Sequence, residues 1–312
     1  MGGEDMDYRG FYLELHRRMR REGMVPVTTY LSGARRGEKK FGTDQGNGCF
    51  SEDFQGQMTV VLCGAGHVSQ ASARIFRELE YRLIVVDDRV EYANAGRFPM
   101  ADEIRCLNFE TEFPDAQFPE HAYYVIVTRG HEHDYTCLRN VLTRSYGYIG
   151  MIGSRSKVKL SRERLAQEGF SAAQIDEVHA PVGLRIGGQT PAEIAVSIAA
   201  EIIQVKNAKS GSTLDSAVLE GLNQAKPSVM VTVTEKEGSS PRGRGSRMVV
   251  TSDGKNYGTI GGGAIEYAAV KRAAEVCRTK AFDTAGYDLS NSDAATLGMA
   301  CGGHVEVMFE PL

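Results

Sequence analysis

The sequence predicts an α/β protein in which a domain with a mainly parallel sheet accompanies a smaller α/β domain. Residues 58–63 form a short apolar run that ends at Gly64, a helical stretch covers 69–79, and a second apolar run covers 81–86. This order of strand, glycine turn, helix and strand is the first unit of a parallel sheet. Further strands are expected at 123–128 and 147–152, whose near-continuous apolar character is typical of strands covered on both faces.

Composition narrows the function classes. The 312 residues include 36 Lys+Arg and 40 Asp+Glu, a formal net charge of 36 − 40 = −4. This balance offers no electrostatic footprint for nucleic acid or an anionic membrane, so neither partner is expected. The apolar runs are far shorter than the roughly 20 residues that span a bilayer, and the N-terminus lacks the features of a secretory signal. A cytoplasmic protein with free thiols is therefore expected.

Turn-rich segments near 42–57 and 207–214 divide the chain into three parts, 1–57, 58–207 and 213–312. The middle part ends in a helix that starts with the capping box Thr190-Pro-Ala-Glu193. One face of this helix is predicted to be buried because its apolar residues recur at helical spacing, namely Ile194, Ile198, Ile202 and Val205.

The third part is predicted to alternate helices and strands around two turn-rich strings, 238–247 and 253–263. The expected elements are a helix at 213–224, strands at 228–234 and 248–251, a helix at 264–278 and a final strand. In that strand Val305, Val307 and Phe309 alternate with polar residues and Met308, which predicts one strongly buried face.

Residues 1–57 repeat the beginning of the third part. Both run from a helix through a β-branched strand to a turn rich in glycine and arginine, with the helix at 8–23 and the strand at 25–30 in the first copy. We interpret 1–57 as a shortened copy of the third part that lacks any counterpart of the strings at 258–263 and 301–303.

The string Gly64-Ala-Gly66-His67-Val68-Ser69 lies between a predicted strand and helix, and Asp87 ends the next strand. In dinucleotide-binding folds such glycines let a pyrophosphate approach the helix N-terminus, and the acid accepts ribose hydroxyls. A tight turn needs glycines for its backbone angles without any ligand. Nucleotide or phosphate binding and a purely structural turn are therefore both open.

Two further strand ends carry polar candidates. Thr128, His131, His133 and Asp134 follow a strand at the edge where ligands of open α/β sheets bind. They suit ligand contact, proton transfer or metal binding, and a solvated polar loop is the alternative. Ser154 and Arg155 follow the next strand as anion-contact candidates, with a helix cap and a solvated basic face as the alternative.

In the third part, Gly261, Gly262 and Gly263 precede a helix and can form an anion-holding nest. Glu266 in the first turn caps this helix or binds a ligand. Cys301, followed by Gly302, carries a soft sulfur suited to a transition metal or to sulfur transfer. A small buried hydrophobe is the alternative for this cysteine.

Several strings together resemble the XdhC/CoxI family of maturation factors for molybdenum hydroxylases such as xanthine dehydrogenase. They are GAGHVS, TRGHEHD, YIGMIGSRSK, APVGLRIGGQTPAEIAVSIAAEII, EGSSPRGRGSRMVV, DGKNYGTIGGGAIE and MACGG. The resemblance covers about residues 58–312. It implies a protein that binds the molybdopterin cofactor, protects it while a cysteine desulfurase installs its terminal sulfur, and delivers it to the apo-hydroxylase.

The resemblance also implies site residues. In the Rossmann-like domain it covers Gly64 to Val68, Gly153 to Arg155 and Thr190 to Ala195. In the other domain the resemblance implies Ser240, Arg242, the glycine loop, Glu266 and Cys301. It implies that Cys301 is the contact to the cofactor and its metal. The usual domain order in the family is the reverse of the one here, where the complete glycine- and cysteine-bearing domain comes last.

The expected function is therefore cofactor insertion by a chaperone rather than catalysis, with molybdenum cofactor bound transiently. The alternative is an NAD(P)- or nucleotide-dependent oxidoreductase that uses Gly64, Gly66 and Asp87, with His131 or His133 as acid and base. We favour the chaperone because the oxidoreductase leaves the glycine loop at 258–263 and Cys301 unexplained. Whether the Rossmann-like domain holds a nucleotide such as NAD(P) and whether the protein is a homodimer are left open.

Overall fold

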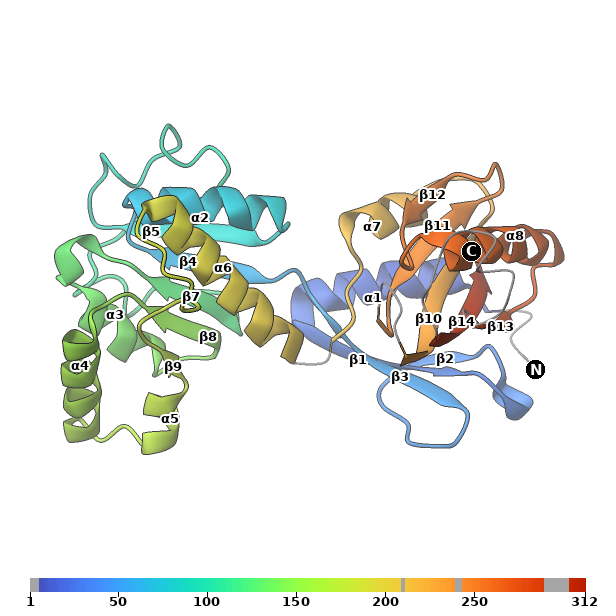
Figure 1. Ribbon diagram of the computed structural model, residues 1–312, viewed down its shortest axis with the longest axis horizontal. Helices are drawn as coiled ribbons and strands as arrows, with labels where there is room; N and C mark the ends of the chain where they lie inside the picture. Colours follow the sequence, from blue (N-terminus) through green and yellow to red (C-terminus); the bar gives the residue numbers. More distant parts are fainter. Residues whose placement is uncertain (1–5, 209–210, 239–242, 289–302) are drawn as a thin grey trace. The chain divides into compact units, whose positions relative to one another are not determined.

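The structure, a computed structural model, describes residues 6–208, 211–238, 243–288 and 303–312. The chain forms two units (Figure 1). One comprises residues 57–210, and the other combines residues 1–56 with residues 211–312. The N-terminal segment, which we interpret as a shortened copy of the third part, thus folds together with that part.

Six parallel strands form the sheet of residues 57–210, in the order β6-β5-β4-β7-β8-β9. The order reverses between β4 and β7, which is the arrangement of dinucleotide-binding α/β folds and confirms the predicted fold class. The strands are β4 (Thr59–Cys63), β5 (Arg82–Asp87), β6 (Glu103–Cys106), β7 (Ala122–Ile126), β8 (Tyr146–Met151) and β9 (Val178–His179).

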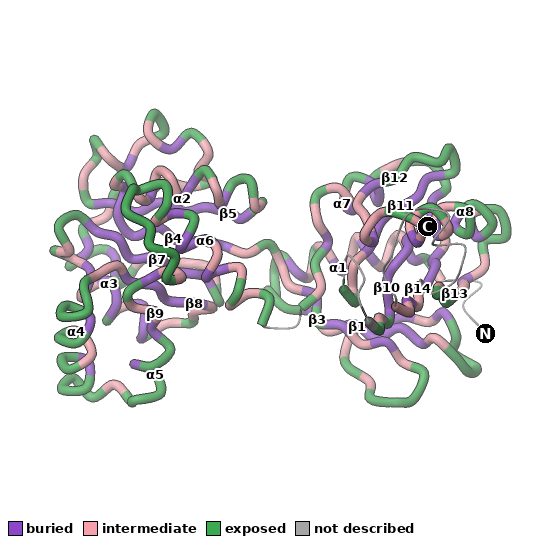
Figure 2. The backbone as a smooth tube through the Cα atoms, viewed as in Figure 1, coloured by how far each residue is buried: buried purple, intermediate pink, exposed green. Residues whose placement is uncertain are grey.

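Helices cover both faces of this sheet, so its central strands are buried throughout (Figure 2). One face packs against α2 (His67–Glu78) and α6 (Pro191–Ala208). The other packs against α3 (Asp134–Val141), α4 (Arg155–Gln167) and α5 (Ala172–Asp176). The α6 face predicted from apolar spacing is confirmed, since Ile198 and Ile202 are fully buried.

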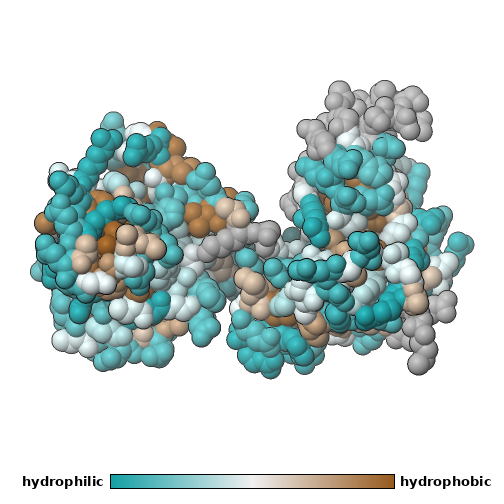
Figure 3. Space-filling model, turned by 90° about the horizontal axis from the view of Figure 1, so that it is seen from below, coloured by the Kyte–Doolittle hydropathy of each residue, from teal (hydrophilic) through white to brown (hydrophobic). Residues whose placement is uncertain are grey.

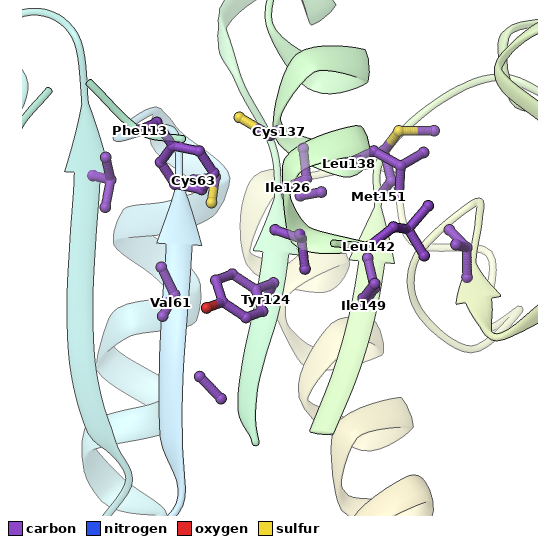
Figure 4. Packing of buried hydrophobic residues seen from close by; sticks show 14 of the residues in the cluster. Val61, Cys63, Phe113, Tyr124, Ile126, Cys137, Leu138, Leu142, Ile149 and Met151 are labelled. Carbon is purple, nitrogen blue, oxygen red and sulfur yellow. The ribbon is translucent and has the colours of Figure 1, made fainter. Parts of the chain in front are cut away.

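Two cysteines belong to the core beneath α3. Cys63 ends β4, Cys137 lies on α3, and both are fully buried among apolar side chains such as Val61 and Ile126 (Figure 4). Burial, together with the neighbouring Cys63 thiol, raises the pKa of Cys137 well above its usual value. These two thiols are packing residues rather than reactive groups.

The second unit contains two antiparallel sheets, β2-β1-β3 from the N-terminal segment and β12-β11-β10-β14-β13 from the C-terminal segment. The N-terminal elements are α1 (Tyr8–Glu22), β1 (Met24–Tyr30), the 3-10 turn η2 (Gly33–Arg35), β2 (Lys39–Phe41) and β3 (Cys49–Gln55). The C-terminal elements are α7 (Ser216–Leu222), β10 (Ser228–Gly238), β11 (Arg247–Thr251), β12 (Asn256–Gly258), α8 (Gly263–Thr279), β13 (Asp283–Asp288) and β14 (Gly303–Pro311).

Both faces of the five-stranded sheet are covered, which differs from the expectation of one buried face. Helix α8 packs on the face of Val305, Val307 and Phe309. The opposite face includes Met308, which is fully buried against Tyr8 and neighbours of the N-terminal segment. The alternation in β14 therefore separates two cores rather than a core from solvent.

Figure 3 shows hydrophilic residues over much of the visible face, with apolar residues gathered in several separate areas. Among the described residues, none of the helices combines the length and apolar character needed to cross a membrane.

Candidate functional site

The glycine turn after β4 lies beside the reversal in strand order, where ligands of such sheets bind. Gly64 has φ +109°, and a Cβ at this position would lie 2.4 Å from the carbonyl oxygen of Val127. The close approach of the β4 and β7 strand ends therefore requires glycine at position 64 whether or not a ligand binds.

Gly66 differs from Gly64 in this respect. It is the N-cap residue of α2, its φ of −78° suits any residue, and no side-chain hydrogen bond caps the helix there. A Cβ at Gly66 would have no neighbour within 4 Å. Packing and backbone conformation do not explain a glycine at this position, whereas a phosphate approaching the first N–H groups of α2 would need the space. The exposed His67 is the first residue of the helix.

Asp87, at the end of β5, is buried, and both of its carboxylate oxygens accept hydrogen bonds from donors of the protein itself. Oδ2 accepts hydrogen bonds from the N–H of Ala65 (2.7 Å) and Arg89 Nη2 (3.0 Å), and Oδ1 accepts from the N–H and Nε of Arg89 (3.1 and 2.8 Å). Burial favours the neutral acid, but these hydrogen bonds outweigh it and hold the pKa of Asp87 below its usual value. Asp87 thus fastens the glycine turn to β5. Its use as a ribose acceptor stays a prediction.

Two guanidinium groups flank this turn. Arg89 and Arg97 lie over the ring of Tyr92, at 3.8 and 4.7 Å from its centroid. Arg97 Nη2 donates to the Ala65 carbonyl (3.3 Å), while its buried Nε has no partner among the described residues. Arg97 was not predicted from the sequence, because no motif marks it. Its charge adds to the attraction of the turn for an anion.

A hydrogen-bonded cluster follows β7. Asp134 Oδ1 accepts from the N–H and the hydroxyl of Thr128 (3.0 and 2.7 Å), and Asp134 Oδ2 lies 2.7 Å from His131 Nδ1. Asp134 is buried, while a third of the His131 side chain is exposed. The carboxylate therefore orients the ring and leaves Nε2 as its second hydrogen-bonding atom, an arrangement suited to proton transfer or ligand contact.

His133 does not join this pair. Its ring stacks on Phe109 with centroids 5.4 Å apart, and its Nε2 lies 3.5 Å from Asp88 Oδ2. The structure thus separates the two histidines that the sequence placed two residues apart.

Ser154 and Arg155 lie at the start of α4. Ser154 is the N-cap residue, and its side chain accepts a hydrogen bond from the N–H of Lys157 (3.4 Å). Arg155 is exposed and lines a pocket of about 660 Å³ together with residues 178–188 and part of α6. We call this the β9 pocket.

In the C-terminal segment, the Glu266 carboxylate accepts hydrogen bonds from donors of the glycine loop. Its Oε2 accepts hydrogen bonds from the Thr259 hydroxyl (2.5 Å) and from the N–H groups of Ile260 (3.2 Å) and Gly262 (3.0 Å). Of the two roles left open by the sequence, capping is the one that this geometry supports. Gly261, Gly262 and Gly263 have positive φ values of 126°, 73° and 65°.

The remaining predicted site residues, Ser240, Arg242, Cys301 and Gly302, lie outside the described residues. Within the described ranges no group of three or more His, Cys, Asp or Glu side chains is placed to hold a metal ion. The metal contact expected at Cys301 therefore stays a prediction.

Comparison with known proteins decides the family. A family model described as the XdhC Rossmann domain matches residues 60–202, and a model described as the XdhC and CoxI family matches residues 222–288. The chain belongs to the XdhC and CoxI family. Both matched domains lie in this one chain, with the XdhC Rossmann domain preceding the XdhC and CoxI domain.

Curated relatives match about half of this XdhC-family chain. A Bacillus subtilis (strain 168) protein, named as a probable subunit of xanthine dehydrogenase, is 31% identical over 163 residues, which are 52% of this chain and 47% of the relative. The uncharacterized protein YqeB of Escherichia coli (strain K12) is 32% identical over 156 residues, 50% of this chain and 28% of YqeB. The chain thus covers less than half the length of either relative.

A solved structure supports the fold. The crystal structure of a xanthine dehydrogenase from Bacillus halodurans superposes with a TM-score of 0.55 and 23% identity, covering 66% of this chain and 69% of that one.

Proposed function

We propose that this protein is a maturation factor for a molybdenum hydroxylase such as xanthine dehydrogenase. It would receive the molybdopterin cofactor as cargo, assist its sulfuration and insert it into the apo-enzyme. The observation that carries the proposal is the presence of both XdhC-family domains in one chain. The Bacillus subtilis relative, whose name refers to xanthine dehydrogenase, supports the same hydroxylase class.

The glycine turn offers a chemically suitable contact for this cargo. Molybdopterin ends in a phosphate group, and Gly66 leaves the N-terminus of α2 open to an anion, with Arg89 and Arg97 beside the turn. Backbone N–H groups and guanidinium groups are the donors that bind phosphate in proteins. In this proposal the turn is a candidate contact for the phosphate end of the cargo, and Cys301 is a separate candidate contact for the molybdenum or its sulfur.

The partners of this proposed role are the apo-hydroxylase and a cysteine desulfurase. The first test is therefore co-expression of a xanthine dehydrogenase with and without this chain, in cells that make molybdenum cofactor but lack their own maturation factor. We expect hydroxylase activity to rise strongly with the chain, and purified chain to carry molybdenum and pterin. Equal activity with and without the chain would contradict the proposal.

A nucleotide-dependent oxidoreductase is the second candidate, and the oriented His131–Asp134 pair is the observation that favours it. An imidazole held by a buried carboxylate can exchange a proton with a substrate during hydride transfer. Calorimetry with NAD⁺ and NADP⁺, followed by an assay of hydride transfer to candidate substrates, separates the candidates. Binding of nucleotide without hydride transfer would leave only a supporting role for the nucleotide in the first proposal.

A further inference from the structure

The β9 pocket lies beyond the carboxyl end of β9 and includes Arg155, an anion-contact candidate from the sequence. Neither the proposed cargo contact at the glycine turn nor the nucleotide hypothesis uses this pocket. Its volume of about 660 Å³ is in the usual range for sites that hold small molecules. It combines apolar residues, among them the exposed Ile186, with the polar side chains of Arg155, His179, Arg185 and Glu201. All of its lining residues belong to the unit of residues 57–210.

Hydrogen bonds within the protein hold the wall of the pocket in place without a ligand. Glu201 Oε2, on α6, accepts hydrogen bonds from the Tyr148 hydroxyl (2.5 Å) and from the N–H of Gly183 (2.9 Å). Ser197, one turn earlier, donates its hydroxyl to the Leu184 carbonyl (2.8 Å). These bonds fix the segment after β9 to α6, so that a ligand would meet an ordered surface.

Glu201 also positions His179. Its Oε1 lies 3.4 Å from His179 Nδ1, and the His179 ring packs on the Tyr148 ring with centroids 4.7 Å apart. Burial favours the neutral acid of Glu201, but the hydrogen bonds from His179, Tyr148 and Gly183 outweigh it and lower its pKa. Glu201 is thus an ionised, fully engaged carboxylate, and His179 Nε2 is the ring atom left for a ligand.

The charges of the pocket favour an anion. Arg155 and Arg185 are both exposed and line it, while Glu201, the one acidic residue among the lining residues, is engaged by the donors described above. Glu193, next to Gly188, is not a lining residue, and its Oε2 accepts hydrogen bonds from the N–H groups of Gln189 and Thr190. The two guanidinium charges of the lining therefore outweigh the single carboxylate charge of Glu201.

We propose that the β9 pocket binds a small molecule that carries a phosphate or carboxylate group. Arg155 and Arg185 would contact the oxyanion, His179 in its imidazolium form would donate a hydrogen bond from Nε2 while Nδ1 stays with Glu201, and the apolar wall around Ile186 would contact the rest of the ligand. Guanidinium groups bind phosphate and carboxylate alike through paired N–H donors. The pocket would therefore select a ligand by the negative charge and the shape of its oxyanion group.

Nuclear magnetic resonance of the full chain with ¹³C-labelled histidine tests this. The His179 signal, assigned by its loss in His179→Gln, is followed during titration with inorganic phosphate and, separately, with acetate. We expect a saturable shift with at least one of the two probes. The probe that binds more tightly identifies the group as phosphate or carboxylate.

Paired variants locate the binding. In Arg155→Gln/Arg185→Gln the affinity should fall by about tenfold or more for each guanidinium removed. Lys157→Gln/Lys159→Gln removes the same charge from exposed positions of α4 outside the pocket lining and should bind as the wild type does. A shift that does not saturate with either probe, or equal affinities in the two paired variants, would overturn the proposal.

Discussion

Lys39 Nζ on β2 lies 2.7 Å from Glu310 Oε1 on β14, and both side chains are fully buried. A second buried pair joins the same two sheets in the opposite sense, because Arg247 Nη2 on β11 lies 2.6 Å from Glu52 Oε1 on β3. Each sheet thus contributes one base and one acid, and each base meets the acid of the other sheet.

The strand registers show that the two ion pairs are equivalent. In the N-terminal sheet Lys39 lies opposite Thr29 and Glu52 opposite Val27. In the C-terminal sheet Arg247 lies opposite Thr232 and Glu310 opposite Met230, at the same spacing. The order β2-β1-β3 then corresponds to β11-β10-β14. This approximate twofold relation supports the interpretation of residues 1–57 as a shortened copy, which stays a prediction.

The first prediction concerns the Lys39–Glu310 pair. Lys39→Met should destabilise the unit by about 3–5 kcal/mol, because Glu310 would remain buried without its cation. Lys39→Met/Glu310→Leu should recover much of this loss. Hydrogen exchange of the β1 amides measures the change, and Lys40→Met, at an exposed ion pair with Asp44, should cost less than about 1 kcal/mol. Equal effects at positions 39 and 40 would contradict this account.

The second prediction separates the two glycines of the turn. Gly64→Ala should destabilise the unit of residues 57–210 by about 2–5 kcal/mol, since it combines a positive φ with overlap with the Val127 carbonyl. Gly66→Ala should change stability by less than about 1 kcal/mol and still reduce molybdenum and pterin retention. Thermal unfolding and metal analysis of the purified chains provide both readouts. Full retention by folded Gly66→Ala would make the turn purely structural.

The third prediction is a pH dependence at Asp87. Its pKa is lower in the folded protein than in the unfolded chain, so ionised Asp87 stabilises the fold above the unfolded value of about 3.9, and this contribution is lost as the pH falls through the folded value. Asp87→Asn should therefore cost about 1.5–3 kcal/mol at pH 7 and progressively less below about pH 4. Urea unfolding of both proteins between pH 7 and pH 3 checks this. A difference that stays constant across the range would assign the loss to packing.

The fourth prediction concerns nucleotide binding at the same carboxylate. If Asp87 also accepts ribose hydroxyls, Asp87→Ala should weaken adenosine-nucleotide binding by about 1.5–3 kcal/mol in calorimetry. A wild-type protein that binds no nucleotide would favour the structural turn, as the four hydrogen bonds from Ala65 and Arg89 already suggest.

The fifth prediction concerns Cys301. Cys301→Ser keeps nearly the same volume but replaces a soft sulfur with a hard oxygen, so a contact to molybdenum or sulfur should be lost while folding survives. The variant should melt within a few degrees of the wild type, retain much less cofactor and mature its hydroxylase poorly. Cys277→Ser, on α8, is the matched control and should leave these properties intact. Equal cofactor retention in both variants would return Cys301 to a packing role.

The sequence predicted the elements whose patterns are local. Helix α6 carries its own capping box and apolar spacing, and the turn at Gly64 follows from a strand, glycines and a helix in series. The burial of Met308 could not be predicted this way, because its partners Tyr8 and Phe50 come from the other end of the chain. Long-range packing leaves no periodic signal in either segment.

In the candidate site, too, the local features could be predicted from the sequence and the side-chain contacts could not. The positions of Thr128, His131 and Ser154 at strand ends were predictable, because the carboxyl ends of parallel strands share one edge of a sheet. Which carboxylates are already engaged was not predictable. The pattern that marks Asp87 as a ribose acceptor is equally compatible with a carboxylate satisfied by Arg89, and only the side-chain geometry distinguishes the two.

The division of one unit between two separated stretches of sequence sets an order for its assembly during synthesis. Residues 57–210 form a continuous unit that can fold as soon as it leaves the ribosome, whereas β1, β2 and β3 emerge first and wait for β10, β11 and β14. Until Glu310 and Arg247 are translated, the charges of Lys39 and Glu52 have no buried partners. A nascent chain stalled before β10 would therefore display the apolar inner face of its N-terminal sheet to the cell's chaperones.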